Sequence, residues 1–349
     1  MMNEAMTQES IMASIQCLCA DEYNQLVERL TEHQEAFNEA KDAIHKILFR
    51  ERSVPSYYVK NGKTTKGNQR YLDKRTGKSV TLTHQSIVRY TKKTYHQWST
   101  YIQLMLYGLS LRECAKIVNI STTTAFHWRH KIMEAMRHYQ EEKRLKGDVQ
   151  VDETYVLLNM KGSWRHQNRP RAAKKRGTPA RRRGINQEHV CVLIAMDEDD
   201  HILTKVIGQG HPNTARLKDG LMSKIEPGST LITDSRKAYE EVSYALGCKL
   251  QTIPSGQHRK GIYNLGLMNQ YHSELKTWLS GFKGVSTKHL EHYLFWFRFM
   301  KIMRYTLESK THSAYTFNYT TACYCEIRSS DIFERPFPID VYKPYQHLS

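Results

Sequence analysis

The chain has 349 residues, of which 40% are hydrophobic and 25% are charged. This length allows two or three compact units, and the composition is that of ordinary globular proteins, which excludes a wholly disordered chain and a collagen-like repeat. No stretch approaches about 18 uninterrupted apolar residues, and the acidic N-terminal segment lacks the pattern of a signal peptide. We therefore expect a cytoplasmic protein that has no membrane partner.

Basic side chains outnumber acidic ones. The 52 Lys and Arg residues exceed the 35 Asp and Glu residues, which gives a formal net charge of +17. Residues 1–50 hold nine acidic and four basic side chains, so the positive charge is concentrated in the rest of the chain. A polyanionic partner is the simplest explanation, and nucleic acid is the commonest polyanion. A basic surface without a specific partner is the alternative.

The seven cysteines include no CxxC pair. Their odd number and their spacing exclude a disulfide framework and a four-thiolate zinc site. Cys191 lies inside the apolar run HVCVLIAMD, and we expect it in the core.

The first 94 residues predict two segments. Apolar side chains recur on one helical face over residues 22–50, which predicts a helical segment within residues 1–50. Pro55 and several glycines then divide residues 51–85 into short β-like runs, so residues 51–94 are predicted to form a small basic β unit.

Two helices joined by a short turn are predicted within residues 95–145. Ser110 and Glu113 have the spacing of a capping box, and Ser121 is a natural cap for the second helix. Threonines and basic side chains at the start of a second helix are typical of a DNA-binding helix-turn-helix. The candidate DNA contacts are Thr122, Thr123, His127, Arg129 and Lys131. An ordinary helical hairpin whose basic face is only solvated is the alternative.

Strands and helices alternate from residue 148 onward. The order strand, hairpin, helix, strand, helix, strand, helix predicts an α/β domain with a ribonuclease-H-like core over residues 146–310. Residues 161–184, between its first two strands, hold ten Lys or Arg and no acid. Such a run is expected to lie against phosphate. Its candidate DNA contacts are Arg165, Arg169, Arg171, Lys174, Lys175, Arg176, Arg181, Arg182 and Arg183.

Two aspartates occupy strand positions that suit metal binding. Asp152 lies within the apolar strand VQVDETY, and Asp234 ends the strand STLITD. A ribonuclease-H-like core sets these strands side by side, where two carboxylates can hold divalent cations for phosphodiester chemistry. Asp234 has the alternative role of capping the helix that follows it.

The helix after the strand KLQTIP offers two candidates for a third ligand, Asn269 and Glu274. At about 100° per residue, Asn269 shares one helical face with His272, Ser273 and Lys276, whereas Glu274 is displaced by about 140° from Asn269. Asn269 is therefore the predicted ligand, and Lys276 is predicted to contact a phosphate or the leaving group.

Residues 148–300 resemble bacterial insertion-sequence transposases of the DDE superfamily, in the ISXO-two-like group. The resemblance rests on VDETY, on LITDSRKAY and on MNQYHSELKTWLSGFKGVSTKHLEHYLFWFRF. In this group an Asn can replace the third acid and a Lys follows seven residues later, as Asn269 and Lys276 do. The resemblance implies that Asp152, Asp234 and Asn269 bind the metal and that Lys276 completes the catalytic set.

The resemblance also implies a function. We expect a nucleoid-associated enzyme that binds the terminal inverted repeats of its element and then cleaves and joins double-stranded DNA. Two Mg²⁺ ions are the expected cofactors, Mn²⁺ being able to substitute, and a homo-oligomer on DNA is the expected assembly. The alternatives are an inactive, transposase-derived DNA-binding protein and a structure-specific nuclease.

The upstream β unit resembles the zinc ribbon of this group but lacks its cysteines. Val54, Tyr57, Asp73 and Thr76 stand where the four thiolates would be. Since a zinc ribbon folds largely through its metal, no zinc is expected there. Residues 311–349 are expected to form a C-terminal tail.

Overall fold

A computed structural model describes most of the chain after residue 55. The described residues are Gln25, 56–65, 69–81, 86–89, 91–137, 139, 143–162, 180, 182–254, 256–257, 259–306, 312–322, 325 and 327–343. The predicted helix over residues 22–50, apart from Gln25, lies outside them, and so do Val54 and most of the basic run 161–184.

The chain divides into two compact units. The first comprises residues up to Tyr107 together with Thr311–Glu326, and the second comprises Gly108–Lys310 together with residues from Ile327 onward. The described elements of the first are β1 (Tyr58–Lys63), β2 (Gln69–Asp73), β3 (Lys78–Thr81), α3 (Tyr95–Leu106) and α10 (His312–Ala322). The five segments expected from the sequence stay a prediction.

Strands β1, β2 and β3 form an antiparallel sheet, as the β-like runs predicted. At its end, Asp73 accepts hydrogen bonds from the Arg75 guanidinium, at 3.2 Å to Nε and 3.1 Å to Nη2. That guanidinium lies 3.6 Å from the centre of the Tyr57 ring. Two residues that stand at expected thiolate positions, Tyr57 and Asp73, thus contact the same internal cation.

The second unit begins with α4 (Leu111–Val118) and α5 (Thr122–Ala135). The predicted capping box is confirmed, because Ser110 Oγ accepts from the Glu113 backbone and the Glu113 carboxylate accepts from the Ser110 backbone. Asn119 ends α4 in the left-handed conformation, with φ of 56°, which short polar side chains tolerate. Ser121 then caps α5 through Thr124.

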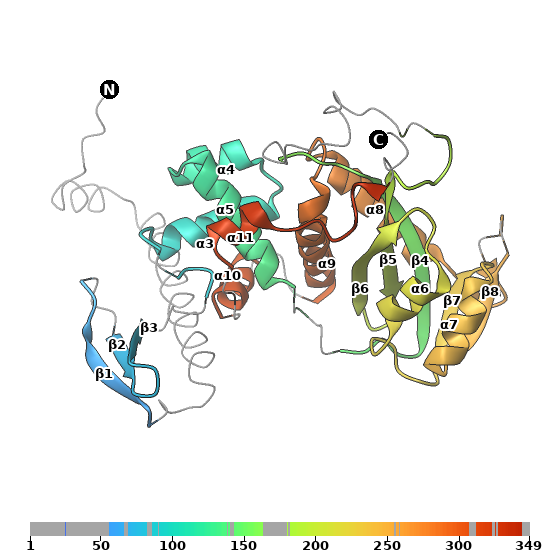
Figure 1. Ribbon diagram of the computed structural model, residues 1–349, viewed down its shortest axis with the longest axis horizontal. Coiled ribbons are helices and arrows are strands. Elements are labelled where there is room, and N and C mark those ends of the chain that lie inside the picture. The colour runs from blue at the N-terminus through green and yellow to red at the C-terminus, as the bar shows by residue number, and fades with distance from the viewer. Residues whose placement is uncertain are drawn as a thin grey trace. The chain divides into compact units, whose positions relative to one another are not determined.

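A five-stranded mixed sheet forms the centre of the second unit (Figure 1). The strand order is β6-β5-β4-β7-β8, with antiparallel pairing from β6 to β4 and parallel pairing from β4 to β8. The strands are β4 (Asp148–Leu157), β5 (His189–Met196), β6 (Ile202–Gln209), β7 (Thr230–Asp234) and β8 (Lys249–Ile253). The α/β class predicted from the sequence is confirmed.

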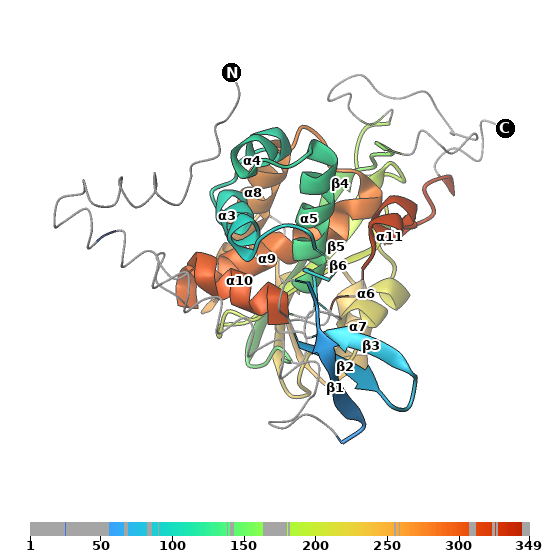
Figure 2. The same ribbon diagram turned by 90° about the vertical axis from the view of Figure 1, so that its left-hand side faces the viewer.

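Helices cover both faces of this sheet. On one face α6 (Thr214–Leu221) and α7 (Ala238–Leu246), which stand in front of the sheet in Figure 1, bury an aliphatic core with Val149, Val151 and Leu231. On the other face lie α8 (Gly266–Ser280) and α9 (Leu290–Thr306). The 3₁₀ turn η1 (Thr287–His289) precedes α9, and α11 (Ser329–Glu334) follows later in the chain. Helix α5 packs against α9, which both ribbon views show (Figure 2).

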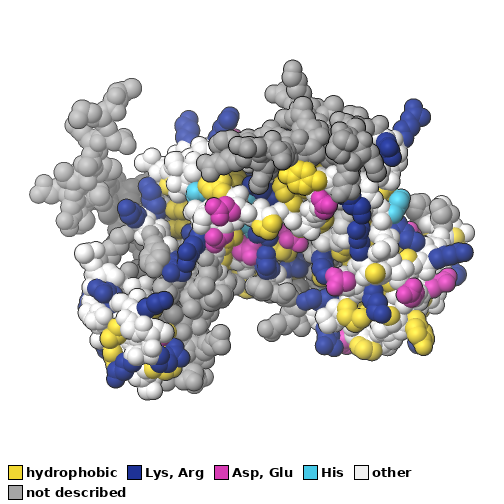
Figure 3. Space-filling model, viewed as in Figure 1, with side chains coloured by type: hydrophobic (Ala, Val, Ile, Leu, Met, Phe, Trp, Pro, Cys, Tyr) yellow, Lys and Arg dark blue, Asp and Glu magenta, His cyan; other side chains and the backbone are white. Residues whose placement is uncertain are grey.

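Charged side chains are spread over the described surface. On the face drawn in Figure 3, Lys and Arg lie over many elements with Asp and Glu among them. In the sequence, the densest cationic stretch is the run 161–184. No helix within the described part of the chain is long and apolar enough to cross a membrane.

Candidate active site

Two aspartates lie on neighbouring parallel strands, near enough for the charge of Asp234 to act on Asp152. Strand β4 pairs with β7 as far as Gln150 opposite Ile232, and Asp152 and Asp234 each lie two residues beyond this last pair. The Gln150 side chain accepts a hydrogen bond of 3.0 Å from the Met268 backbone of α8. Because side chains alternate between the faces of a strand, Asp152 also points to the α8 side of the sheet.

The surroundings of this pair suit a bound cation. Burial raises the pKa of Asp152 to about 6, and the negative charge of Asp234 acts in the same direction, against the Glu153 backbone hydrogen bond and the charges of Arg236 and Lys276. A cation between the carboxylates would relieve their repulsion, and carboxylate oxygens are the ligands that Mg²⁺ takes in proteins. The residues present therefore fit a divalent cation.

Asp234 does not cap the helix that follows it. Helix α7 begins after Lys237 and has no side-chain cap, whereas the Asp234 carboxylate accepts a 3.2 Å hydrogen bond from the Arg236 backbone. The capping alternative raised by the sequence is thus not what the structure shows.

The two candidates for a third ligand, Asn269 and Glu274, have different surroundings on α8. Asn269 and Lys276 are exposed on α8, and the charge of Lys276 opposes the rise in the pKa of Asp152. The Glu274 carboxylate instead accepts hydrogen bonds of 2.8 Å from Lys301 of α9 and 2.9 Å from Gln270, which lower its pKa. The Glu274 carboxylate is therefore paired with Lys301 of α9. Lys276, in contrast, lies near enough to Asp152 for its charge to act on that carboxyl.

His272 is a site residue to which the sequence analysis gave no role. It is buried on α8, and its Nδ1 lies 3.8 Å from Asp152 Oδ2. Burial, assisted by the Lys276 charge, lowers its pKa to about 4, so the ring is neutral. Its buried Nε2 has no hydrogen-bond partner. The sequence does contain one indication of a role for His272. It lies three residues after Asn269 and four before Lys276, which places all three on the same helical face.

A buried ion pair links the two acidic motifs from the other face of β4. The Glu153 carboxylate accepts a 2.8 Å hydrogen bond from the Tyr239 hydroxyl and pairs with Arg236 Nη1 at 2.9 Å. Arg236 Nη2 also lies 4.0 Å from Asp234 Oδ2. Burial raises the pKa of Glu153 to about 7, and Arg236 opposes that rise. Glu153, next to Asp152, thus binds Arg236, which lies two residues after Asp234.

The predicted DNA contacts on α5 differ in exposure. Thr122 and Thr123 are exposed at the start of the helix, and Lys131 is half-buried. His127 is half-buried and meets the Phe333 ring edge-on, with ring centres 5.0 Å apart.

Arg129 is used inside the protein. It is buried, and its Nη2 donates a 2.8 Å hydrogen bond to the Leu109 carbonyl and lies 3.6 Å from Cys114 Sγ. A guanidinium held in this way supports the turn before α4 and cannot reach a phosphate without breaking these contacts. We therefore leave Arg129 out of the DNA-binding surface proposed below.

The basic run contributes two described candidates. Arg182 and Arg183 are exposed just before β5. The other candidates lie outside the described residues, namely Arg165, Arg169, Arg171, Lys174, Lys175, Arg176 and Arg181.

Residues 144–301 match the model of the ISXO2-like transposase domain. Over 232 residues the chain is 23% identical to an uncharacterized protein in the transposable element ISH50 of Halobacterium salinarum, covering 65% of this chain and 76% of that protein.

Solved structures give weaker matches. The mariner Mos1 paired-end complex with Mg is 12% identical, covering 71% of this chain and 79% of that chain, with a TM-score of 0.28. A simian T-cell lymphotropic virus intasome is 10% identical, covering 68% of this chain and 75% of that chain, also with a TM-score of 0.28. The match over 144–301 and the insertion-element relative confirm the resemblance seen in the sequence, and the chain contains an ISXO2-like transposase domain.

Proposed function

We propose that the protein is the transposase of an insertion sequence, which binds the ends of its element and catalyses DNA strand cleavage and strand transfer with Mg²⁺. The observation that carries this proposal is the pair Asp152 and Asp234 on the adjacent strands β4 and β7, where the charge of Asp234 acts on the Asp152 carboxyl. The family match and the relative from an insertion element support it. The strand order, with an antiparallel hairpin beside three parallel strands, supports a ribonuclease-H-like core.

The side chains divide the work by position. Asp152 and Asp234 hold divalent cations, Asn269 adds a carboxamide oxygen, and Mg²⁺ or Mn²⁺ supplies Lewis-acid activation of the oxygens at phosphorus when bound. Lys276 contacts the phosphate or the leaving oxygen from the exposed face of α8. Neutral His272 packs beside the Asp152 carboxylate and fixes its direction without adding charge.

In this proposal DNA is bound by the segments before the domain match and by the basic run within it. Residues 51–94 and 95–145 act as a zinc-ribbon-like β unit without zinc and as a helix-turn-helix, and Thr122, Thr123 and Lys131 of α5 contact the element ends. The run 161–184, including Arg182 and Arg183, lies along the phosphate backbone. Two or more copies act together, because two element ends are joined.

The second candidate function is an inactive DNA-binding protein derived from such an enzyme. The carboxamide of Asn269 in place of an acid favours it. A cleavage and strand-transfer assay on the DNA that flanks the gene, with Mg²⁺ and with EDTA, separates the two. Mg²⁺-dependent nicks at the element ends support the transposase, and end binding without any cleavage at either metal condition supports the inactive protein.

The third ligand is tested by comparing two substitutions on α8. Asn269→Ala is expected to reduce cleavage by about 10²-fold or more, because it removes an oxygen from the cation site. Glu274→Ala is the matched control and is expected to change cleavage by less than about threefold, since its carboxylate pairs with Lys301. Rates are measured on pre-nicked and intact end substrates. The reverse ranking would assign the ligand to Glu274.

The phosphate contacts are tested through salt. The affinity for element ends is expected to fall by about 10³-fold between 50 and 200 mM salt if about six phosphates are contacted. Changing Arg181, Arg182 and Arg183 to Gln is expected to make the plot of log K against log [salt] less steep by about two to three. The control changes Lys218, Lys224 and Lys249, which lie beyond the run, to Gln. An equal loss of slope in the control, or a flat response in the wild type, would remove the run from the interface.

A further inference from the structure

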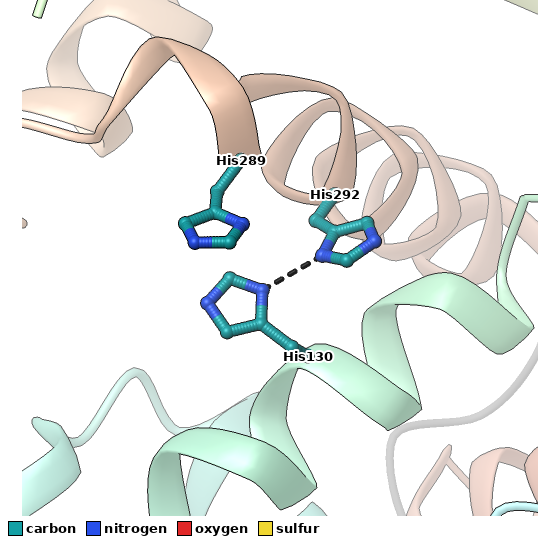
Figure 4. Close-up of side chains that lie close together, drawn as sticks. All are labelled: His130, His289 and His292. Atoms are coloured by element: carbon teal, nitrogen blue, oxygen red, sulfur yellow. Dashed lines mark hydrogen bonds between the residues drawn. The ribbon is translucent and has the colours of Figure 1, made fainter. Parts of the chain in front are cut away.

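Three histidines from distant parts of the sequence meet in the second unit. His130 lies on α5, His289 ends η1, and His292 lies in the first turn of α9. All three are buried, with exposed fractions of 1%, 6% and 0%. One ring nitrogen from each lies within 4.8 Å of the others. Figure 4 shows the three rings turned toward a common space between the helices.

The hydrogen bonds of His292 aim its Nδ1 lone pair at that space. Its Nε2 lies 2.5 Å from Glu134 Oε2 and also contacts Arg335 Nη1; in the tautomer that carries the proton on Nε2, the ring donates to the carboxylate. His292 Nδ1 is therefore an acceptor, and it lies 2.7 Å from His130 Nδ1. A carboxylate behind a histidine is the arrangement that orients metal-ligating imidazoles in proteins. Arg335 pairs with the same carboxylate at 3.0 Å and keeps it ionised.

His289 supplies a second, independent observation. Its Nδ1 is buried and has no hydrogen-bond partner. A buried polar atom without a partner carries a cost that a ligand would remove. Its ring lies beside that of His130, with ring centres 4.3 Å apart and the ring planes tilted by 38°.

We propose that His130, His289 and His292 bind a divalent transition metal, with zinc as the metal that this site takes. Neutral imidazoles are ligands that zinc prefers, and three of them leave a fourth position for water. Zinc–nitrogen bonds of about 2.05 Å place two ligand nitrogens about 3.3 Å apart. The Nδ1 atoms of His130 and His292 thus separate by about half an ångström, within the reach of small ring rotations.

Binding leaves the proton balance unchanged. In the tautomer in which neutral His292 donates from Nε2 to Glu134, the proton between the two Nδ1 atoms belongs to His130. That proton moves to His130 Nε2 when Nδ1 takes the metal, and both rings stay neutral. His130 and His289 also line a hollow of about 1220 Å³, which gives the metal a path to the site.

The metal site itself does not depend on the proposed function, but its structural consequence rests on that function. The metal joins α5, the proposed recognition helix, to η1 and α9 of the catalytic core. It would fix the direction in which Thr122 and Thr123 are presented, while Asp152 and Asp234 hold their own cations on the sheet. Loss of the histidine site therefore loosens α5 and leaves the carboxylate pair in place.

The test is metal content of the full-length protein. After incubation with zinc and dialysis against buffer, the wild type is expected to retain about one zinc per chain. His289→Asn and His292→Asn are expected to lose it, and His127→Asn, one turn earlier on α5, is the matched control that keeps it. Asp152→Ala is also expected to keep it, which separates this site from the carboxylate pair.

Cobalt gives a readout on the unaltered chain in case a variant fails to fold. Cobalt bound at this site is expected to show ligand-field bands of a nitrogen-ligated, four-coordinate ion, without thiolate charge-transfer bands. Three results would overturn the proposal. The first is a wild type that retains no zinc, the second is retention of as much zinc by His289→Asn and His292→Asn as by the wild type, and the third is a cobalt spectrum that shows thiolate bands.

Discussion

Asp152→Ala and Asp234→Ala are each expected to lower Mg²⁺-dependent strand cleavage by at least about 10³-fold, because either change removes a charged ligand worth several kcal/mol to the transition state. Alanine is the sharper change, since an introduced carboxamide could still offer an oxygen to the cation. Binding of the element ends is expected to stay within about threefold of the wild type, because the carboxylates do not contact the binding segments in our proposal. Cleavage of end substrates and gel-shift titrations measure the two quantities.

Asp148→Ala is the matched control for this pair. Asp148 begins the same strand and lies about 13 Å from Asp152 along it. Its substitution is expected to change cleavage by less than about threefold. If Asp152→Ala or Asp234→Ala still cuts at more than a tenth of the wild-type rate, the metal assignment is wrong. If all the variants and the wild type bind but do not cut, the inactive alternative holds.

Arg236→Met is expected to give the largest loss of stability, about 3 kcal/mol in the free energy of unfolding. The change leaves the Glu153 carboxylate, whose side chain is 0% exposed, without the cation at 2.9 Å. The neutral acid is accessible because burial already raises the pKa of Glu153 to about 7, and this limits the loss. Urea unfolding at pH 8 measures this change in the free energy of unfolding. At this pH, above the pKa of about 7, Glu153 without Arg236 must either carry an unpaired buried charge or take up a proton from solution.

Two companion variants show whether this loss comes from an unpaired buried charge. Glu153→Gln combined with Arg236→Met is expected to recover most of the stability, because the amide carries no charge and still accepts from Tyr239. Lys205→Met breaks the exposed pair with Asp219 and is expected to cost less than about 0.5 kcal/mol. An Arg236→Met protein within about 1 kcal/mol of the wild type would show that the pair does not carry the link between the motifs.

The carboxylate pair and the histidine cluster differ in how visible they are to sequence reasoning. Asp152 and Asp234 each lie in an apolar strand. A charged residue is unusual there, so its position indicates a functional role. His289 and His292 lie in a pattern of histidines three residues apart, but His130 is more than 150 residues away and looks like one basic residue among several on α5. Only the packing of α5 on α9 brings the three rings together.

The sequence alone determined the strands and helices of the second unit, the caps of α4 and α5, and the α/β class, because hydrophobic periodicity and capping act between residues close in the chain. It also indicated the helical face that carries Asn269 and Lys276. Only the tertiary structure decided which side chains are hydrogen-bonded or ion-paired within the protein. Arg129 bonds the Leu109 carbonyl, Glu274 pairs with Lys301, and Glu153 pairs with Arg236. These partners are 20 or more residues apart, and a periodic pattern cannot report a contact that depends on how two elements pack.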